Sequence, residues 1–144
     1  MRRRKPGRAR ANPEKDYGIH LTVNSEFAKY RWRSVAPREK VPSLLDEDGY
    51  LYRGARAVVE NAKVDEVEIE LRAQIERAKE FGIPLSHLDT HMGTLLMRAD
   101  LFELYVRLGV EYNLPILFMS KVDKARLKAY PGLADNFEAK ADLL

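Results

Sequence analysis

The sequence has no cysteine, and none of its apolar runs approaches the roughly 18 residues that a membrane-spanning helix needs. The lack of cysteine excludes disulfide bonds, thiolate zinc sites and a cysteine nucleophile, and it is typical of a reducing compartment. The basic start MRRRKPGRAR is not followed by an apolar segment, so we expect no signal peptide. These absences favour a cytoplasmic protein without a membrane partner.

The composition and charge are typical of one folded domain with a basic end. The 144 residues are 45% apolar and 33% charged, as in a globular domain. Residues 1–10 hold six of the 25 basic residues and no acid, so the other 19 stand against 22 acidic residues. We expect a disordered basic tail over 1–13 and a folded domain over 14–144. Binding of nucleic acid by this tail is the weakest of our functional expectations.

Alternating and helical patterns predict strands and helices in turn. The expected elements are strands at 17–23, 86–91 and 115–119 and helices at 65–81 and 99–112. This order is typical of parallel βαβ units, so we expect an α/β fold with parallel strands. The segment 24–62 is expected to be irregular with a turn at 43–50, and 121–144 to form a short helix and a loose tail.

The helix at 65–81 has the clearest signals. Asp65 and Glu68 have the spacing of a capping box, and Gly82 is expected to end the helix. Asn113 is expected to end the second helix in the same way. We expect Glu70 on the face opposite the apolar stripe. That stripe consists of Val67, Leu71, Ile75 and Ala78.

All three histidines lie in the expected strands. His87, Asp89 and His91 fall on one face of their strand, and His20 lies on the first strand. Because ligands gather at the carboxyl ends of parallel strands, we expect His20 and His91 to meet in space. Imidazole and carboxylate groups together suit a divalent metal. The alternative is a set of hydrogen-bonded histidines in the core or at its rim.

Six blocks between Asp16 and Pro115 have a characteristic order and spacing. They are GIHLT at 18–22, YRW at 30–32, VPSLLDEDGY at 41–50, EVEIELRAQIERAKEFGIP at 66–84, SHLDTHMGTL at 86–95 and ELYVRLGVEYNLP at 103–115. In these blocks the sequence resembles the YdjC-like carbohydrate deacetylase family, which includes chitooligosaccharide deacetylases. The resemblance covers roughly two-thirds of the chain.

The resemblance implies a TIM-barrel-like (β/α) fold and hydrolysis of the acetamide group of an N-acetylated sugar or oligosaccharide. It implies a divalent ion, commonly magnesium, with zinc or manganese as alternatives. It gives His20 and His91 as metal ligands, with Asp89 and His87 beside them as the catalytic candidates. In the implied reaction a carboxylate takes a proton from water, and the ion and nearby donors hold the oxyanion.

The sequence departs from the family pattern at both ends. Family members begin with a strand that carries an acidic A-D-D-type motif, and the Arg-rich tail stands in its place here. A complete barrel takes about 250 residues, so we expect a partial barrel that lacks its N- and C-terminal parts. Two histidines without the first-strand aspartate should bind metal weakly. An inactive short chain is therefore the alternative to an active deacetylase.

The YRW block lies in the long segment after the first strand. Trp32 and Arg31 are the substrate-binding candidates there, because aromatic faces stack on sugar rings. The alternative is that these side chains cover apolar surface beneath the loop. The competing function is a non-catalytic interaction protein, since missing barrel strands would leave sheet edges that pair with another chain, including a second copy in a homodimer.

Overall fold

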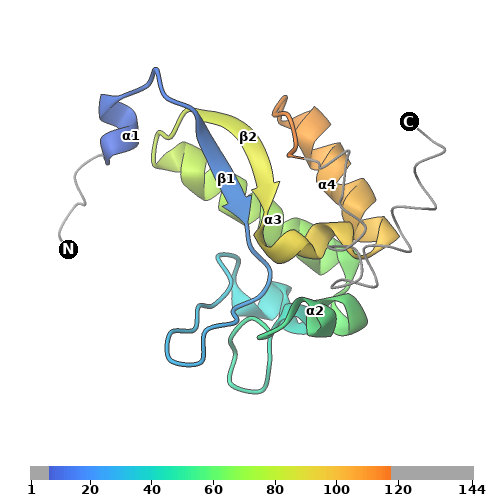
Figure 1. The fold of residues 1–144 in the computed structure, drawn as a ribbon. Helices are drawn as coiled ribbons and strands as arrows, with labels where there is room; N and C mark the ends of the chain where they lie inside the picture. The colour runs from blue at the N-terminus through green and yellow to red at the C-terminus, as the bar shows by residue number, and fades with distance from the viewer. Residues whose placement is uncertain (1–6, 118–144) are drawn as a thin grey trace, which may run out of the picture.

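The computed structural model describes residues 7–117, which form a two-stranded sheet backed by helices (Figure 1). The α-helices are α1 (Arg8–Ala11), α2 (Ala55–Asn61), α3 (Val64–Glu80) and α4 (Ala99–Glu111). The strands are β1 (Tyr17–Leu21) and β2 (Leu85–Thr90), and the 3₁₀ helices are η1 (Arg38–Lys40), η2 (Pro42–Leu44) and η3 (His91–Leu96). Within this part of the chain, no helix is long and apolar enough to cross a bilayer.

The two strands lie side by side and parallel, which confirms the predicted α/β class. Their register pairs His20 with Asp89 and Leu21 with Thr90. Of the strand predicted at 115–119, the structure forms one parallel bridge between Leu88 and Ile116. Residues 118 and 119 lie outside the described residues, as does the segment 121–144.

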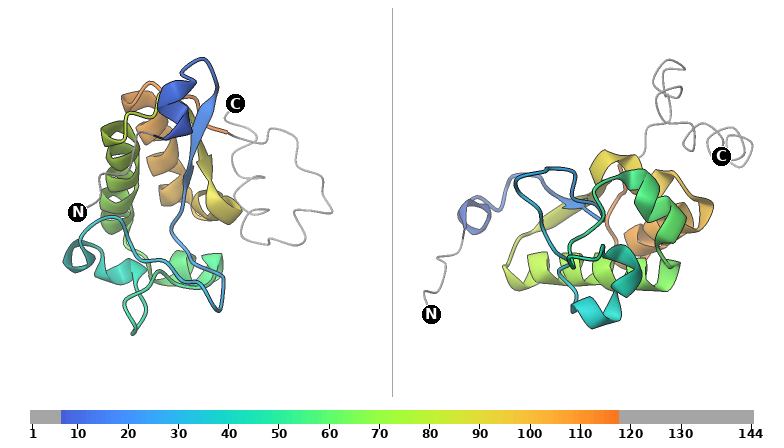
Figure 2. Two further views of the ribbon diagram at one scale, coloured as in Figure 1. Left: turned by 90° about the vertical axis from the view of Figure 1, so that its left-hand side faces the viewer. Right: turned by 90° about the horizontal axis from the view of Figure 1, so that it is seen from below.

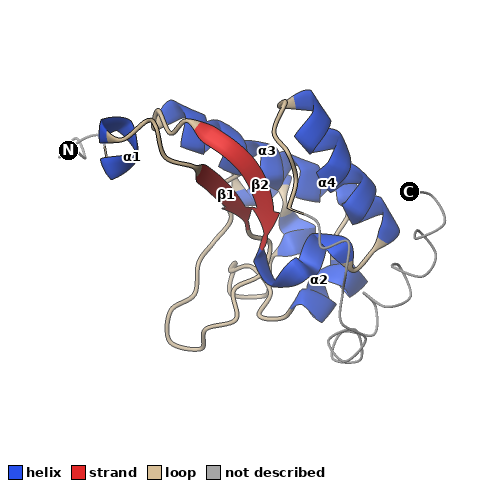
Figure 3. Cartoon of the chain, turned by 45° about the horizontal axis from the view of Figure 1, so that its top comes forward, coloured by secondary structure: helices blue, strands red, loops and turns tan. Residues whose placement is uncertain are grey.

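Helices α3 and α4 cover the same face of the two strands (Figures 2 and 3). Leu21 of β1 and Leu88 of β2 are fully buried on this face, in one cluster with Leu71 of α3. Because side chains alternate along a strand, His20 and Asp89 point to the opposite face. Their side chains are 53% and 32% exposed, so the face of the sheet away from α3 and α4 carries these polar groups.

Helix α3 buries its predicted stripe, but the predicted capping box is wrong. The helix begins at Val64, and no side chain caps it. The backbone N–H of Lys63 donates instead to Ser43 Oγ at 2.9 Å, so a residue distant in sequence satisfies the helix start. Glu68 does not reach back to the cap, because it pairs with Arg107 of α4 at 2.6 Å. The buried stripe is Val67, Leu71, Ile75 and Ala78.

The predicted ends of α3 and α4 are confirmed, and both use a residue with positive φ. Gly82 has φ +68°, and the N–H of Ile83 donates to Ala78 O at 3.2 Å. Asn113 has φ +53°, and the N–H of Leu114 donates to the carbonyl five residues earlier at 2.8 Å. These are the contacts of the Schellman motif, which glycine and asparagine favour because they tolerate the left-handed region.

The expectation that all of 24–62 is irregular is wrong at α2. This helix has only seven residues, which is too short for a periodic pattern to be evident. It is held by burial of Ala55 and Val58 against the rest of the core. The turn expected at 43–50 is present, because the N–H of Asp46 donates to Tyr50 O at 2.8 Å.

The basic tail is ordered where it meets the domain. Residues 8–11, which we expected to be disordered, form the single turn of α1. Two contacts hold it: the side chain of Arg10 lies over Gly82, and Tyr17 Oη donates to Asn12 O at 3.1 Å. Residues 1–6 lie outside the described residues.

Candidate functional site

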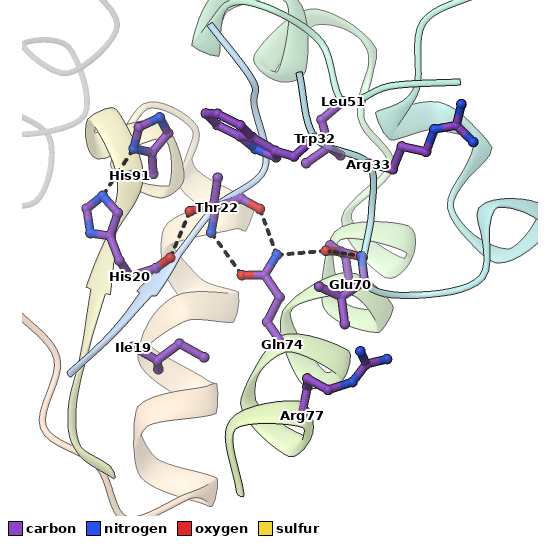
Figure 4. A pocket seen from close by; sticks show the side chains of 11 residues that line it. Ile19, His20, Thr22, Trp32, Arg33, Leu51, Glu70, Gln74, Arg77 and His91 are labelled. Carbon is purple, nitrogen blue, oxygen red and sulfur yellow. Dashed lines mark hydrogen bonds between the residues drawn. The ribbon is translucent and has the colours of Figure 1, made fainter. Parts of the chain in front are cut away.

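The parallel register brings His20 and His91 together at the carboxyl ends of the two strands. His20 lies opposite Asp89 in the pairing, and His91 begins η3 directly after β2. His20 Nε2 is 3.1 Å from His91 Nδ1, and the two rings meet edge to face with centroids 5.1 Å apart. Figure 4 shows these nitrogens pointing at each other at one end of a pocket.

Each histidine uses its other ring nitrogen to contact a carboxylate. His20 Nδ1 lies 2.6 Å from Asp89 Oδ2, and His91 Nε2 lies 2.8 Å from Glu26 Oε2. A carboxylate only accepts hydrogen bonds, so each of these outer nitrogens carries a hydrogen. In neutral rings both facing nitrogens then carry lone pairs. Their 3.1 Å contact therefore requires a shared proton or a bound cation between them.

The separation of the facing nitrogens fits two neighbouring ligands of one metal ion. Nitrogen ligands at about 2.0–2.1 Å from a metal, at angles between octahedral and tetrahedral, lie about 2.8–3.4 Å from each other. The 3.1 Å between His20 Nε2 and His91 Nδ1 lies in this range. Residues 7–117 contain no group of three or more His, Cys, Asp or Glu side chains arranged to hold a metal. Further ligands would have to be water, substrate or groups outside these residues.

Glu26 is the fourth member of a row of contacting side chains, Asp89, His20, His91 and Glu26, and no sequence pattern marked it. It lies in the segment expected to be irregular, five residues after the end of β1. Its side chain is 30% exposed, and the hydrogen bond from His91 holds the pKa of its carboxyl below the usual range. An acid shortly after a histidine-bearing strand is too common a pattern to have singled it out.

His87 does not join the other histidines. It lies on the same strand face as Asp89, but its ring rests over Gly18, which is its partner in the register. Its Nδ1 is 2.9 Å from Ser86 Oγ. A side chain at position 18 would collide with this ring, so the glycine makes room for it. Of the expected site residues, the structure thus groups His20, Asp89 and His91 and leaves His87 apart.

Trp32 lines a pocket of about 470 Å³ that opens beside the two facing histidines (Figure 4). Its ring lies edge to face with His91, with centroids 6.1 Å apart, and its Nε1–H donates to Asn24 O at 3.0 Å. Arg31 turns away into the loop, where it pairs with Asp46 at 2.6 Å and donates to Leu51 O. Trp32 therefore both lines the pocket and packs against the core cluster, whereas Arg31 contacts the loop alone.

Glu70 and Gln74 of α3 hold two of the segments that line the pocket. Glu70 is fully buried, which corrects its expected place on the solvent side of α3. Its carboxylate accepts the backbone N–H groups of Val35 and Ala36, both at 2.9 Å, and burial raises its pKa. Gln74 bridges Glu70 to both backbone groups of Thr22 just after β1. The pair thus ties the Trp32 loop to the strand that carries His20.

Comparison with known proteins places these residues in a family context. The family described as YdjC-like protein matches residues 3–142. The chain is 31% identical over 129 residues to a carbohydrate deacetylase from Thermoanaerobacter pseudethanolicus, and 42% identical over 99 residues to one from Thermus thermophilus. These alignments cover 87% and 69% of this chain but 47% and 36% of the relatives. The chain thus spans about half of their length or less.

A solved structure is similar in the same way. A crystal structure from Enterococcus faecalis V583, of a protein proposed to cleave cellobiose phosphate, superposes with a TM-score of 0.69 at 30% identity. The match covers 90% of this chain and 47% of that one. Nearly all of this chain therefore corresponds to one half of a larger fold.

Proposed function

We propose that this chain, which belongs to the YdjC-like family, contributes a metal-dependent site that hydrolyses the acetamide group of N-acetylated sugars or oligosaccharides. The relatives named carbohydrate deacetylases are about twice as long, so the activity of the whole protein is part of the proposal. We further propose that β1 and β2 are neighbouring strands of a (β/α) barrel, whose interior is the face that carries His20 and Asp89.

The observation that carries this proposal is the facing pair of imidazole nitrogens, 3.1 Å apart, each held from behind by a carboxylate. His20 Nε2 and His91 Nδ1 would hold the ion. A divalent ion bound there supplies Lewis-acid chemistry, which polarises a carbonyl and lowers the pKa of water. Two imidazoles suit zinc better than magnesium, which prefers oxygen ligands, so magnesium would need additional oxygen groups.

The other site residues would orient the histidines and the sugar. Asp89 keeps a proton on His20 Nδ1, which leaves Nε2 directed at His91. The half-buried ring of Trp32, which lines the pocket, would stack on a sugar ring there, as aromatic side chains do on flat apolar surfaces. His87 and Arg31 receive no part in the reaction, because each is occupied by contacts away from the facing nitrogens.

The test is release of acetate from an N-acetylated chitooligosaccharide. We expect the purified chain to release acetate with zinc, manganese or magnesium and not in the presence of a chelator. His20→Ala removes one of the two facing nitrogens, so we expect loss of at least about 100-fold in activity. Trp32→Ala should mainly raise KM, since it would remove sugar stacking.

A full-length deacetylase of the family, assayed in parallel, controls for the substrate and the ion. If that enzyme releases acetate and this chain does so with none of the three ions, the proposed activity of this chain is refuted. Acetate release that His20→Ala leaves unchanged would refute the assigned site.

A second candidate function is pairing with another chain through the edge of β1. The described sheet has only two strands, so β1 has one strand neighbour. Gln74 already occupies the backbone groups of Thr22 beyond the strand, which shortens the edge that remains. Light scattering over a range of concentrations tests this idea, and a monomer at every concentration would count against a homodimer.

A further inference from the structure

Of the row Asp89, His20, His91 and Glu26, only Glu26 was neither expected from the sequence nor found among the residues that line the pocket. We propose that Glu26 is a positioning residue: it fixes the ring of His91 with its proton on Nε2, so that Nδ1 presents a lone pair to His20. This inference rests on the proposed function for the purpose of the arrangement. The positioning itself is a property of the metal-free protein.

The geometry gives His91 two different ring environments. Nε2 lies 2.8 Å from Glu26 Oε2, whereas Nδ1 lies 3.1 Å from another imidazole nitrogen. A neutral imidazole has one donor and one acceptor nitrogen, and only the donor can satisfy a carboxylate. Glu26 therefore selects one tautomer and one orientation of the ring. Turning the ring over would place a C–H against the carboxylate and remove the contact with His20.

The position of Glu26 is built into the fold. The two preceding residues, Asn24 and Ser25, are both fully buried. Asn24 Oδ1 accepts from Thr94 Oγ1 at 2.9 Å, which ties the segment to η3, the element that begins with His91. The N–H of Ser25 donates to Tyr52 O at 2.8 Å. Glu26 thus follows two fixed residues, and its carboxylate reaches His91 from a defined backbone position.

The same arrangement occurs on the other histidine. Asp89 Oδ2 lies 2.6 Å from His20 Nδ1, so both outer nitrogens carry protons and both inner nitrogens carry lone pairs. Carboxylates in this place orient metal-binding histidines, and their loss typically costs about 10–100-fold in metal affinity. A single carboxylate would prepare only one of the two nitrogens. Glu26 completes the pair.

The direct test is the tautomer of His91 in metal-free protein, read from long-range ¹H–¹⁵N correlation spectra of histidine-labelled samples. We expect one form in the wild type, with a proton on His91 Nε2. Glu26→Ala should lose that single form, and Glu26→Gln should retain it, because the amide oxygen still accepts the hydrogen bond. A wild-type His91 without a proton on Nε2, or an unchanged His91 spectrum in Glu26→Ala, would overturn the inference.

Calorimetric titration with Zn²⁺ supplies a second readout. We expect Glu26→Ala to bind about 10–100-fold more weakly than wild type and Glu26→Gln to bind nearly as well. Glu60→Ala is the matched control, because Glu60 is an exposed acid that pairs with Arg56 on α2. If zinc binds none of these proteins while the tautomers are as expected, the proposed function fails and the positioning role stands. If zinc binds and Glu26→Ala changes neither the tautomer nor the zinc affinity, the positioning role fails and the metal site of the proposed function stands.

Discussion

Between α3 and α4, four charged side chains form a row in which each contacts a side chain of opposite charge. Glu68 of α3 accepts from Arg72 at 2.7 Å and from Arg107 of α4 at 2.6 Å, and both arginines also pair with Glu111. Every contact joins opposite charges. The hydrogen bond from Arg107, with that from Arg72, lowers the pKa of Glu68 to about 2.

At the ends of the two strands, Asp89, His20, His91 and Glu26 also form a row, but the two nitrogens at its centre both lack a hydrogen-bond donor. Asp89 and Glu26 occupy the two outer nitrogens, and His20 and His91 are left with two bases facing each other. The first row links two helices, whereas the second requires a proton or a cation to become favourable. The two rows therefore have different effects: the row of ion pairs between the helices contributes to stability, and the row at the strand ends prepares a binding site.

The largest effect that separates the two regions should come from the core beneath the helices. Leu71 is fully buried in α3. Leu71→Ala should lower the free energy of unfolding by about 2–5 kcal/mol, because it removes buried methyl groups and leaves a cavity. Urea denaturation measures this loss. Zinc affinity of the remaining folded protein should be unchanged, since the facing nitrogens lie on the other side of the sheet.

Leu71→Met provides the control, because a volume-conserving change should cost less than about 1.5 kcal/mol. If Leu71→Ala weakens zinc binding by a free energy similar to its loss of stability, the core and the site are not energetically separate.

The next effect should appear at the site alone. Asp89 Oδ1 accepts from the N–H of Thr90 at 2.6 Å, and Oδ2 faces His20 Nδ1. In Asp89→Asn the oxygen would stay with Thr90, and the amide group would donate to His20 Nδ1. The proton of His20 would move to Nε2, where it would fill the gap to His91. We expect about 10–100-fold weaker zinc binding, measured by calorimetry, with little change in stability.

The spectra described for His91 also report this change at His20. A proton that remains on His20 Nδ1 in Asp89→Asn, together with unchanged zinc affinity, would show that the carboxylate does not prepare this nitrogen.

Much of the arrangement of both regions could be predicted from local sequence patterns, because those patterns follow from burial. The stripe of α3 and the alternation in β1 and β2 each mark a face that packs on the core. Once the strands are parallel, the meeting of His20, Asp89 and His91 follows from the register. Gly82 and Asn113 were predictable because the left-handed conformation has few alternatives.

The rest depends on contacts between residues far apart in sequence. Helical spacing puts Glu70 on the polar face of α3, yet the backbone of Val35 and Ala36 folds onto it and buries it. Ser43 replaces the expected cap of α3 for the same reason. Glu26 reaches His91 because the hydrogen bond between Asn24 and Thr94 holds the segment after β1 against η3. No local period records such contacts, so the sequence predicted the histidines and missed one of their carboxylate partners.

The smallest effect should be confined to the helical row. The folded pKa of Glu68, about 2, lies below its ordinary value of 4.5, so its ionised form stabilises the fold above pH 4.5. That contribution is lost as the pH falls toward 2. Glu68→Gln should therefore lower stability at pH 7 by about 1 kcal/mol, a modest value because the partner arginines are partly exposed to water.

Urea denaturation of wild type and Glu68→Gln at pH 7 and near pH 2 measures this difference, which should shrink at the lower pH. Glu68→Gln and Asp89→Asn make the same chemical change, from carboxylate to amide, in the two rows. If the rows differ as described, Glu68→Gln changes stability and leaves zinc affinity alone, and Asp89→Asn does the opposite. Equal effects of both variants on either quantity would refute the difference between the two rows.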